Sequence, residues 1–148
     1  MYKLDQIDLD ILAALQADGR ITNVALARQV GLSATPCLER VKSLEAEGLI
    51  TGYVARLSAS ALGLGLTVFV QIAIERTSQR VFDAFREAVQ AIPEIEECHM
   101  VAGGFDYLLK TRMADMAAYR AFAGRVLWQL PGVRETRTYA VMEEVKSG

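Results

Sequence analysis

The sequence predicts an α+β protein, with an N-terminal (winged) helix-turn-helix domain followed by a C-terminal ferredoxin-like βαββαβ domain. Two observations carry this prediction. In residues 23–48, apolar, small and glycine residues have the spacing that is typical of a helix-turn-helix motif. After residue 65, segments in which apolar and polar residues alternate, as in strands, are separated by segments whose apolar residues recur with helical spacing. A linker containing serine and glycine, residues 56–65, marks the change, so the predicted domains are residues 4–65 and residues 66–148.

The composition is typical of a folded globular chain. Of the 148 residues, 52% are hydrophobic and 23% are charged. No apolar run is long enough to span a membrane and no leader opens the chain, so we expect a cytoplasmic protein. Cys37 and Cys98 are few and far apart, which favours reduced thiols over a disulfide framework. One histidine and two scattered cysteines do not close a zinc site by themselves, and we expect no metal and no cofactor.

The N-terminal unit is predicted to hold three helices and a short wing. The first helix covers residues 4–17, with Asp5 as its cap and with Asp8 and Asp10 near the positive end of the helix dipole. Its buried stripe consists of Leu4, Ile7, Ile11, Leu12 and Leu15. Residues 49–54 are β-rich in composition and are predicted to form a strand or wing that closes the unit.

The helix-turn-helix begins with a helix over residues 23–30. Ala27 is small enough to let a second helix cross closely, and Gly31 can adopt the left-handed conformation that ends a helix. Either Ser33 or Thr35 caps the next helix. The inward stripe of that helix consists of Cys37, Val41 and Leu44. An ordinary pair of core helices is the alternative interpretation.

The net charge of this half does not by itself indicate nucleic-acid binding. Residues 1–56 hold six basic and seven acidic side chains, six minus seven giving −1, whereas nucleic-acid modules are usually basic. The distribution is more favourable, because residues 19–56 hold five basic and three acidic side chains. A dimer or larger assembly would also multiply a weak basic patch.

The second half is predicted to contain four strands and two helices. The strands cover residues 66–75, 95–102, 105–113 and 133–145, and the helices cover residues 79–91 and 116–130. Ser78 and Asp115 are the predicted N-caps, and Gly103-Gly104 is the predicted two-residue hairpin turn with positive φ. Both helices should cover one face of an antiparallel sheet. The other face mixes apolar and polar residues, so we expect a dimer through this half, with a partly solvated sheet face as the alternative.

Three stretches of the chain resemble the Lrp/AsnC family, the feast/famine transcription regulators, and in particular its leucine-responsive branch. They are LSATPCLERV (residues 32–41), GGFDYLLKTR (residues 103–112), and the C-terminal stretch that starts with LPGV at residue 130 and continues with TRTYAVMEEVK at residue 136. The resemblance covers nearly the whole chain. It implies a nucleoid-associated regulator that binds double-stranded DNA with its first half. It also implies that the second half senses an amino acid, leucine by default, and forms homodimers that assemble into octamers.

The recognition helix is expected to enter the major groove by its first turns. Ser33 and Thr35 have hydroxyl groups suited to phosphates or base edges, beside Pro36 in the first turn, and simple capping is the alternative for both hydroxyls. Arg40 is the candidate for pairing with guanine O6 and N7, with a surface ion pair to Glu39 or Glu47 as the alternative. The predicted phosphate contacts, which set affinity but not sequence preference, are Arg28 and Lys42.

The resemblance places an effector site at the hairpin and the neighbouring strands, between subunits. The matching positions are Met100, Gly103, Gly104, Asp106, Met116, Tyr139, Ala140 and Val141. In this hypothesis Asp106 accepts the ammonium group, backbone N–H groups at the two glycines hold the carboxylate, and Met100, Met116 and Val141 contact an aliphatic side chain. Many relatives carry an acidic residue at position 104. A plain turn for the glycines and core positions for the methionines are the alternatives.

No catalytic residues are predicted. His99 lacks evident partners for catalysis or metal binding, so a hydrogen-bonded structural role is expected, and no nucleophile elbow, phosphate loop or paired-carboxylate signature is present. Sirohaem decarboxylases resemble this family in plan and are the enzyme alternative, but they would call for more pocket histidines and a degenerate recognition helix. A third hypothesis is a metabolite-sensing or scaffold protein that uses only the second half.

Overall fold

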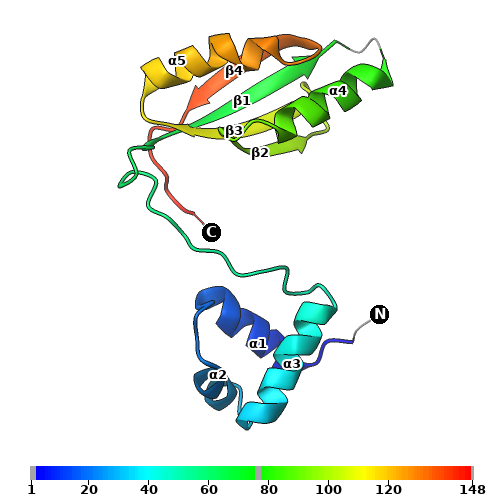
Figure 1. The fold of residues 1–148 in the computed structure, drawn as a ribbon, viewed down its shortest axis with the longest axis vertical. Helices are drawn as coiled ribbons and strands as arrows, with labels where there is room; N and C mark the ends of the chain where they lie inside the picture. Colours follow the sequence, from blue (N-terminus) through cyan, green and yellow to red (C-terminus); the bar gives the residue numbers. More distant parts are fainter. Residues whose placement is uncertain (1–2, 76–77, 148) are drawn as a thin grey trace. The chain divides into compact units, whose positions relative to one another are not determined.

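The chain folds into two compact units, one ending at Arg56 and one beginning at Leu57 (Figure 1). The computed structural model describes residues 3–75 and 78–147. Residues 58–64 do not form an open linker, because the amide of Leu64 donates to the carbonyl of Ala59 at 2.8 Å around Gly63, whose φ is 74°. This closed turn belongs to the second unit, whereas the sequence placed the boundary after residue 65.

The first unit contains the three predicted helices, α1 (Gln6–Ala17), α2 (Asn23–Gln29) and α3 (Ala34–Ala46). Asp5 caps α1 as predicted and forms a capping box with Asp8. Thr22 caps α2, a cap that the sequence analysis did not assign. Between the two sequence candidates, Ser33 is the N-cap residue of α3, although its side chain makes no capping hydrogen bond. The buried core consists of Ile11, Ala14, Leu26, Ala27, Cys37 and Leu44.

The predicted strand at residues 49–54 is wrong, since this segment has no regular secondary structure. The amides of Leu49 and Ile50 both donate to the carbonyl of Leu44, at 2.9 and 3.1 Å, and so close the end of α3. The Tyr53 hydroxyl then donates to Glu45 Oε1 at 2.9 Å. A lone strand needs a partner strand to satisfy its backbone, and the described part of this unit provides no strand to pair with it.

The second unit has the predicted ferredoxin-like order. It consists of β1 (Leu66–Ile74), α4 (Gln79–Gln90), β2 (Ile95–Met100), β3 (Tyr107–Met113), α5 (Met116–Arg125), the 3₁₀ helix η1 (Leu127–Gln129) and β4 (Val133–Ala140). The four strands form one antiparallel sheet in the order β2-β3-β1-β4. Ser78 and Asp115 are the N-cap residues of α4 and α5, and Asp115 accepts a hydrogen bond from the amide of Ala118.

The core of this unit lies on one face of the sheet. Alternate residues of β1 pack with residues of both helices, and this set is Val68, Val70, Ile72, Ile74, Phe85, Val89, Tyr119 and Phe122. Tyr107 of β3 stacks beside Phe85 with the ring centroids 4.4 Å apart. Phe69 and Gln71 point to the other face, the open face, which the helices leave uncovered.

Two predicted elements end several residues earlier than the sequence suggested. The helix predicted to reach residue 130 ends at Arg125, because Val126 leaves the helical region (φ −120°, ψ −60°) and η1 follows. The strand predicted to reach residue 145 ends at Ala140. Its partner β1 begins at Leu66, and the last backbone hydrogen bond runs from the amide of Val141 to the carbonyl of Thr67. Beyond that point β1 has only its first residue, Leu66, so the pairing cannot continue to residue 145.

Candidate nucleic-acid interface and ligand pocket

The turn between α2 and α3 has the tight geometry of a helix-turn-helix. Gly31 has a φ of 73°, as predicted, and the amide of Leu32 donates to the carbonyl of Ala27 at 2.8 Å. Ala27 is only 2% exposed, so a larger side chain would push the two helices apart. Asn23 Nδ2 donates to the carbonyl of Ala34 at 2.7 Å and ties the start of α2 to the start of α3. The leading end of α3 is therefore fixed against α2.

Most of the predicted DNA-binding residues lie on the surface of this unit. The exposed ones are Arg28, Ser33, Thr35, Pro36 and Lys42. Ser33 stands at the N-terminus of α3, where the backbone N–H groups of the first turn have no intrahelical acceptor. These positions suit contact with an anionic backbone, since the helix dipole also favours negative charge at that end.

Arg40 is placed differently from what the sequence suggested. Its Nη1 lies 2.7 Å from Asp5 Oδ2 and 2.7 Å from Asp8 Oδ1, and neither predicted partner, Glu39 or Glu47, is involved. Asp8 is 2% exposed, and the Arg40 side chain is 31% exposed. The hydrogen bonds from the Asp8 amide and from Arg40 hold the pKa of Asp5 below its ordinary value. In this structure the guanidinium joins α3 to the N-terminus of α1 and does not extend into solvent toward a base.

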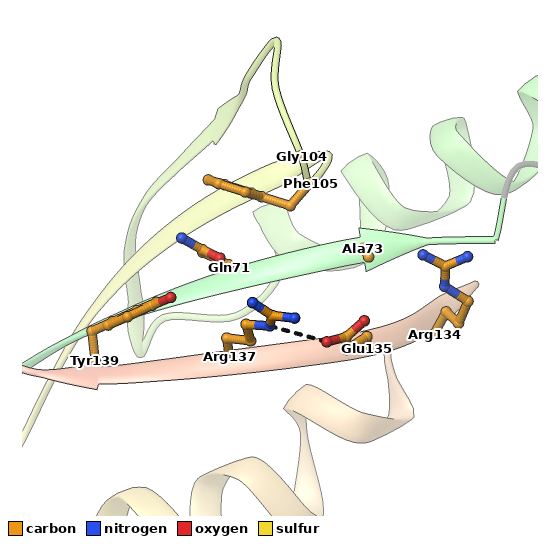
Figure 2. A pocket seen from close by; sticks show the side chains of 8 residues that line it. All are labelled: Gln71, Ala73, Gly104, Phe105, Arg134, Glu135, Arg137 and Tyr139. Carbon is orange, nitrogen blue, oxygen red and sulfur yellow. Dashed lines mark hydrogen bonds and ion pairs between the residues drawn. The ribbon is translucent and has the colours of Figure 1, made fainter.

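A cavity of about 350 Å³ lies on the open face of the second unit, between β1, β4 and the connection from β2 to β3 (Figure 2). β1 contributes Gln71 and Ala73, the connection contributes Gly104 and Phe105, and β4 contributes Arg134, Glu135, Arg137 and Tyr139. Arg137 Nε donates to Glu135 Oε1 at 3.0 Å. The site thus presents a guanidinium and a carboxylate side by side, within reach of two aromatic rings.

The sequence found part of this cavity and missed the rest. Gly104 and Tyr139 were predicted effector residues and line it. Arg134, Glu135 and Arg137 were not predicted, although the register places Glu135 and Arg137 opposite Ala73 and Gln71 of β1. The available signal was the two-residue spacing of Glu135 and Arg137, which puts both side chains on the same side of a strand.

The prediction of a two-residue hairpin at Gly103-Gly104 is wrong. The connection spans residues 101–106 and is closed by the amide of Val101, which donates to the carbonyl of Asp106 at 3.0 Å. Neither glycine has a positive φ, and a Cβ at either position would meet open space. The backbone therefore does not require glycine here, and position 104 has room for a side chain beside the cavity.

Asp106 was predicted to accept a ligand ammonium group, but in the structure its carboxylate forms a hydrogen bond with the backbone of β1. Asp106 is 7% exposed, and its Oδ2 accepts a hydrogen bond from the amide of Ile74 at 2.8 Å. The amide of Asp106 donates in turn to the carbonyl of Ile72 at 2.9 Å. Because β3 begins only at Tyr107, these bonds continue the pairing with the end of β1. The carboxylate is used inside the fold and does not line the cavity.

The remaining predicted effector residues also lie outside the cavity lining. Met100 and Met116 are half exposed, at 56% and 50%, so they do not occupy the core positions that were the alternative for them. Met100 is paired with Tyr107 and its sulfur lies 3.5 Å from Arg86 Nη2 of α4, on the helix side of the sheet. Ala140 and Val141 stand at the end of β4, beyond Tyr139.

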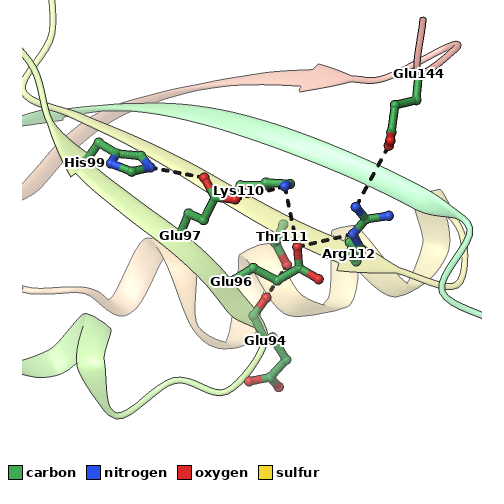
Figure 3. Close-up of polar contacts among 8 residues, drawn as sticks. All are labelled: Glu94, Glu96, Glu97, His99, Lys110, Thr111, Arg112 and Glu144. Carbon is green, nitrogen blue, oxygen red and sulfur yellow. Dashed lines mark hydrogen bonds and ion pairs between the residues drawn. The ribbon is translucent and has the colours of Figure 1, made fainter. Parts of the chain in front are cut away.

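The strands β2 and β3 carry a chain of ion pairs on the open face (Figure 3). Lys110 Nζ lies 2.9 Å from Glu97 Oε1, and Arg112 Nε lies 3.2 Å from Glu96 Oε2. His99 Nε2 is 3.1 Å from Glu97 Oε2, so the histidine has the hydrogen-bonded role that was expected. Hydrogen bonds from Lys110 and His99 lower the pKa of Glu97.

Cys37 and Cys98 are both free thiols. Cys37 is buried in the core of the first unit, and Cys98 packs partly buried against the core of the second. Burial raises the pKa of the Cys98 thiol to about 11, which keeps it protonated and unreactive at neutral pH. Among residues 3–75 and 78–147, no group of three or more potential metal ligands comes together and no helix is long and apolar enough to cross a membrane.

Comparison with known proteins gives matches along nearly the whole chain. The family described as "Lrp/AsnC ligand binding domain" matches residues 67–148, and the one described as "Winged helix-turn-helix DNA-binding" matches residues 4–51. The leucine-responsive regulatory protein of Escherichia coli is 58% identical over 143 residues, which cover 97% of this chain and 87% of that protein.

Solved structures agree with these matches. A transcriptional regulator of Neisseria meningitidis in complex with L-Met is 37% identical, with a TM-score of 0.94 over 98% of this chain and 94% of that one. An AsnC family transcriptional regulator of Agrobacterium tumefaciens is 35% identical, with a TM-score of 0.92 over 97% of this chain and 94% of that one.

Proposed function

Because the chain belongs to the Lrp/AsnC family of DNA-binding transcription regulators, which are not enzymes, we propose that it is a cytoplasmic regulator that binds specific DNA sites and responds to leucine. The observation that carries this proposal is the cavity beside β4, which offers opposite charges to a zwitterion and lies in the ligand-binding domain. The 58% identity to leucine-responsive regulatory proteins favours leucine over other small amino acids. The tetrapyrrole decarboxylase alternative is not favoured, since the relatives bear the names of transcription regulators.

DNA binding is assigned to the exposed leading end of α3. Ser33, Thr35 and Pro36 surround the open backbone N–H groups of the first turn, which suit a phosphate oxygen at the edge of the major groove. Arg28, in the last turn of α2, and Lys42, about two turns along α3, are both exposed, so we assign them to phosphates. Such contacts release counterions and make the affinity dependent on salt.

Replacing Arg28 and Lys42 together by glutamine should lower the DNA affinity without changing which sequences are preferred. The slope of log affinity against log salt concentration should fall in magnitude by about two, one for each lost phosphate contact. Fluorescence anisotropy with a labelled operator fragment at several salt concentrations measures this slope. Arg120→Gln, an exposed cation of α5, is the matched control and should leave the slope unchanged. An unchanged slope in the double variant would remove both residues from the interface.

Leucine binding is assigned to the cavity of Figure 2. The guanidinium groups of Arg134 and Arg137 suit the ligand carboxylate, and the Glu135 carboxylate suits the ammonium group. Phe105 and Tyr139 offer apolar surface to an aliphatic side chain. A volume of about 350 Å³ lies at the small end of the usual range for ligand sites, as expected for a free amino acid.

The variant Arg137→Gln should weaken leucine binding by about tenfold, the usual loss for one charge-assisted hydrogen bond. Titration calorimetry with the full chain gives the affinity directly. Arg125→Gln is the control, because Arg125 also pairs with a glutamate, Glu94, but lies outside the cavity lining. Equal leucine affinity in the wild type and in Arg137→Gln would show that Arg137 does not bind the carboxylate.

Homodimers are assigned to the open face of the sheet, with further assembly to octamers. This face combines the apolar side chains of Phe69 and Leu108, both half-buried, with acidic residues on β2 and basic residues on β3. Neighbouring strands of opposite charge make the face self-complementary for a two-fold partner. Light scattering measures the size of the assembly and operator binding measures the DNA affinity, each in the presence of a panel of free amino acids. If no amino acid changes either the assembly size or the DNA affinity, the sensing function is refuted.

A further inference from the structure

The recognition helix α3 presents two different sides to its surroundings. One side faces the core through Cys37 and Leu44, both with no exposed surface. Thr35, Glu39 and Lys42 are spaced so that they share the opposite side, and all three are exposed. Arg40 belongs to neither set, because its position lies at the flank of the helix that faces the start of α1.

The start of α1 is built to receive that guanidinium. Asp5 Oδ1 accepts from the amide of Asp8 at 2.9 Å, and Asp8 Oδ2 accepts from the amide of Asp5 at 3.2 Å, so the capping box orients both carboxylates. Arg40 Nη1 then lies within 2.8 Å of both Asp5 oxygens and within 2.7 Å of Asp8 Oδ1. Asp8 is almost fully buried, so its charge needs a cationic partner in the folded unit.

We propose that Arg40 is a positioning residue that locks α3 to the capping box of α1, and that sequence preference along α3 comes from the exposed side chains of Thr35 and Glu39. A guanidinium that contacts a base would have to leave two carboxylates of its own chain, and the departure would leave Asp8 buried without that cation. The Glu39 carboxylate can accept a hydrogen bond from the exocyclic amine of cytosine. Lys42, three residues further along the helix, offsets the repulsion between that carboxylate and the DNA phosphates.

This inference deepens the proposed DNA-binding function and makes opposite predictions for two neighbouring residues. Arg40→Gln should weaken binding to all DNA sequences by a common factor of about tenfold, because a loosened α3 loses contacts everywhere. Its base preferences should stay those of the wild type. Glu39→Gln should keep the fold and the non-specific affinity while it changes the preferred base at one position of the site.

In the test, the full-length chain selects binding sites from a pool of random DNA duplexes, and the selected duplexes are sequenced. Affinities are then measured for selected duplexes and for unrelated ones. Asp8→Asn and the double variant Asp8→Asn/Arg40→Gln are included, and thermal unfolding is followed by far-UV circular dichroism. If Arg40 acts through Asp8, the double variant should be no worse than the worse single variant in both affinity and stability. Arg40→Lys keeps the positive charge, so it should bind DNA more tightly than Arg40→Gln but less tightly than the wild type. It replaces Arg40→Gln in the experiment if Arg40→Gln does not fold.

The inference would be overturned by a changed preference at one base in Arg40→Gln or Arg40→Lys, or by an unchanged preference profile in Glu39→Gln. Additive effects of the Asp8 and Arg40 variants on unfolding would also overturn it, and that measurement needs no DNA. A wild-type chain that binds no duplex would instead refute the DNA-binding function, so the two failures are distinguishable.

Discussion

Replacing Gly132 by alanine should destabilise the C-terminal unit by roughly 2–4 kcal/mol, from backbone strain and steric overlap together. Gly132 has a φ of 70°, which L side chains rarely adopt. A Cβ there would overlap Val81 Cγ1 of α4 and lie 3.3 Å from Ile74 Cγ2 of β1. Neither neighbour can move freely, because Val81 and Ile74 pack in the core and the Gly132 carbonyl is held by the amide of Glu75 at 2.8 Å.

The control for this prediction is Gly63→Ala in the same unit. Gly63 has a φ of 74°, but a Cβ there would meet nothing within 4 Å, so only the backbone cost of about 1 kcal/mol is expected. Denaturant titration followed by the fluorescence of Trp128, the chain's single tryptophan, reports on this unit. If both variants lose the same free energy of unfolding, the packing of Gly132 against α4 contributes nothing.

Asp106→Ala should lower the free energy of unfolding of the same unit by about 1.5–3 kcal/mol, the range for a hydrogen bond to a charged group. The variant removes the acceptor of the Ile74 amide at the end of β1, in a part of the sheet where Ile74 is 2% exposed. Asp106→Asn keeps an acceptor oxygen and should lose less. The folded fraction of the alanine variant should still bind leucine, because the carboxylate does not line the cavity.

This expectation reverses the hypothesis drawn from the family resemblance, in which Asp106 holds the ligand ammonium group and its loss spares the fold. Trp128 fluorescence and leucine calorimetry on the same samples separate the two accounts. A stable Asp106→Ala variant that no longer binds leucine would restore Asp106 to the effector site.

Much of the fold followed from short-range patterns. The apolar periodicity gave the helices of the first unit and the βαββαβ order of the second, and Asp5 and Asp115 were identified as caps from their positions alone. Gly31 was identified as a positive-φ residue from its place after an apolar stripe. Each of these features depends on residues within about one turn of one another, so the sequence displays them directly.

The errors concern features that depend on residues far apart in the chain. The ion pairs of Arg40 join residues 35 and 32 positions away, and the bond from Ile74 to Asp106 joins residues 32 positions apart. The end of β4 at Ala140 depends on where β1 begins, and the absence of a strand at residues 49–54 depends on whether a partner strand lies beside it. No local pattern carries that information.

The sequence by itself determined the two-part α+β plan, the caps of α1 and α5, the turn after α2, and the family to which the chain belongs, because hydrophobic periodicity and backbone preferences act over a few residues. The tertiary structure alone decided which charges meet. It brought Arg40 to the capping box of α1, turned Asp106 into the fold, and gathered Gln71, Glu135 and Arg137 around one cavity. A charged side chain takes whichever partner the packing of the backbone places within about 3 Å of it, and that packing is set by the whole fold.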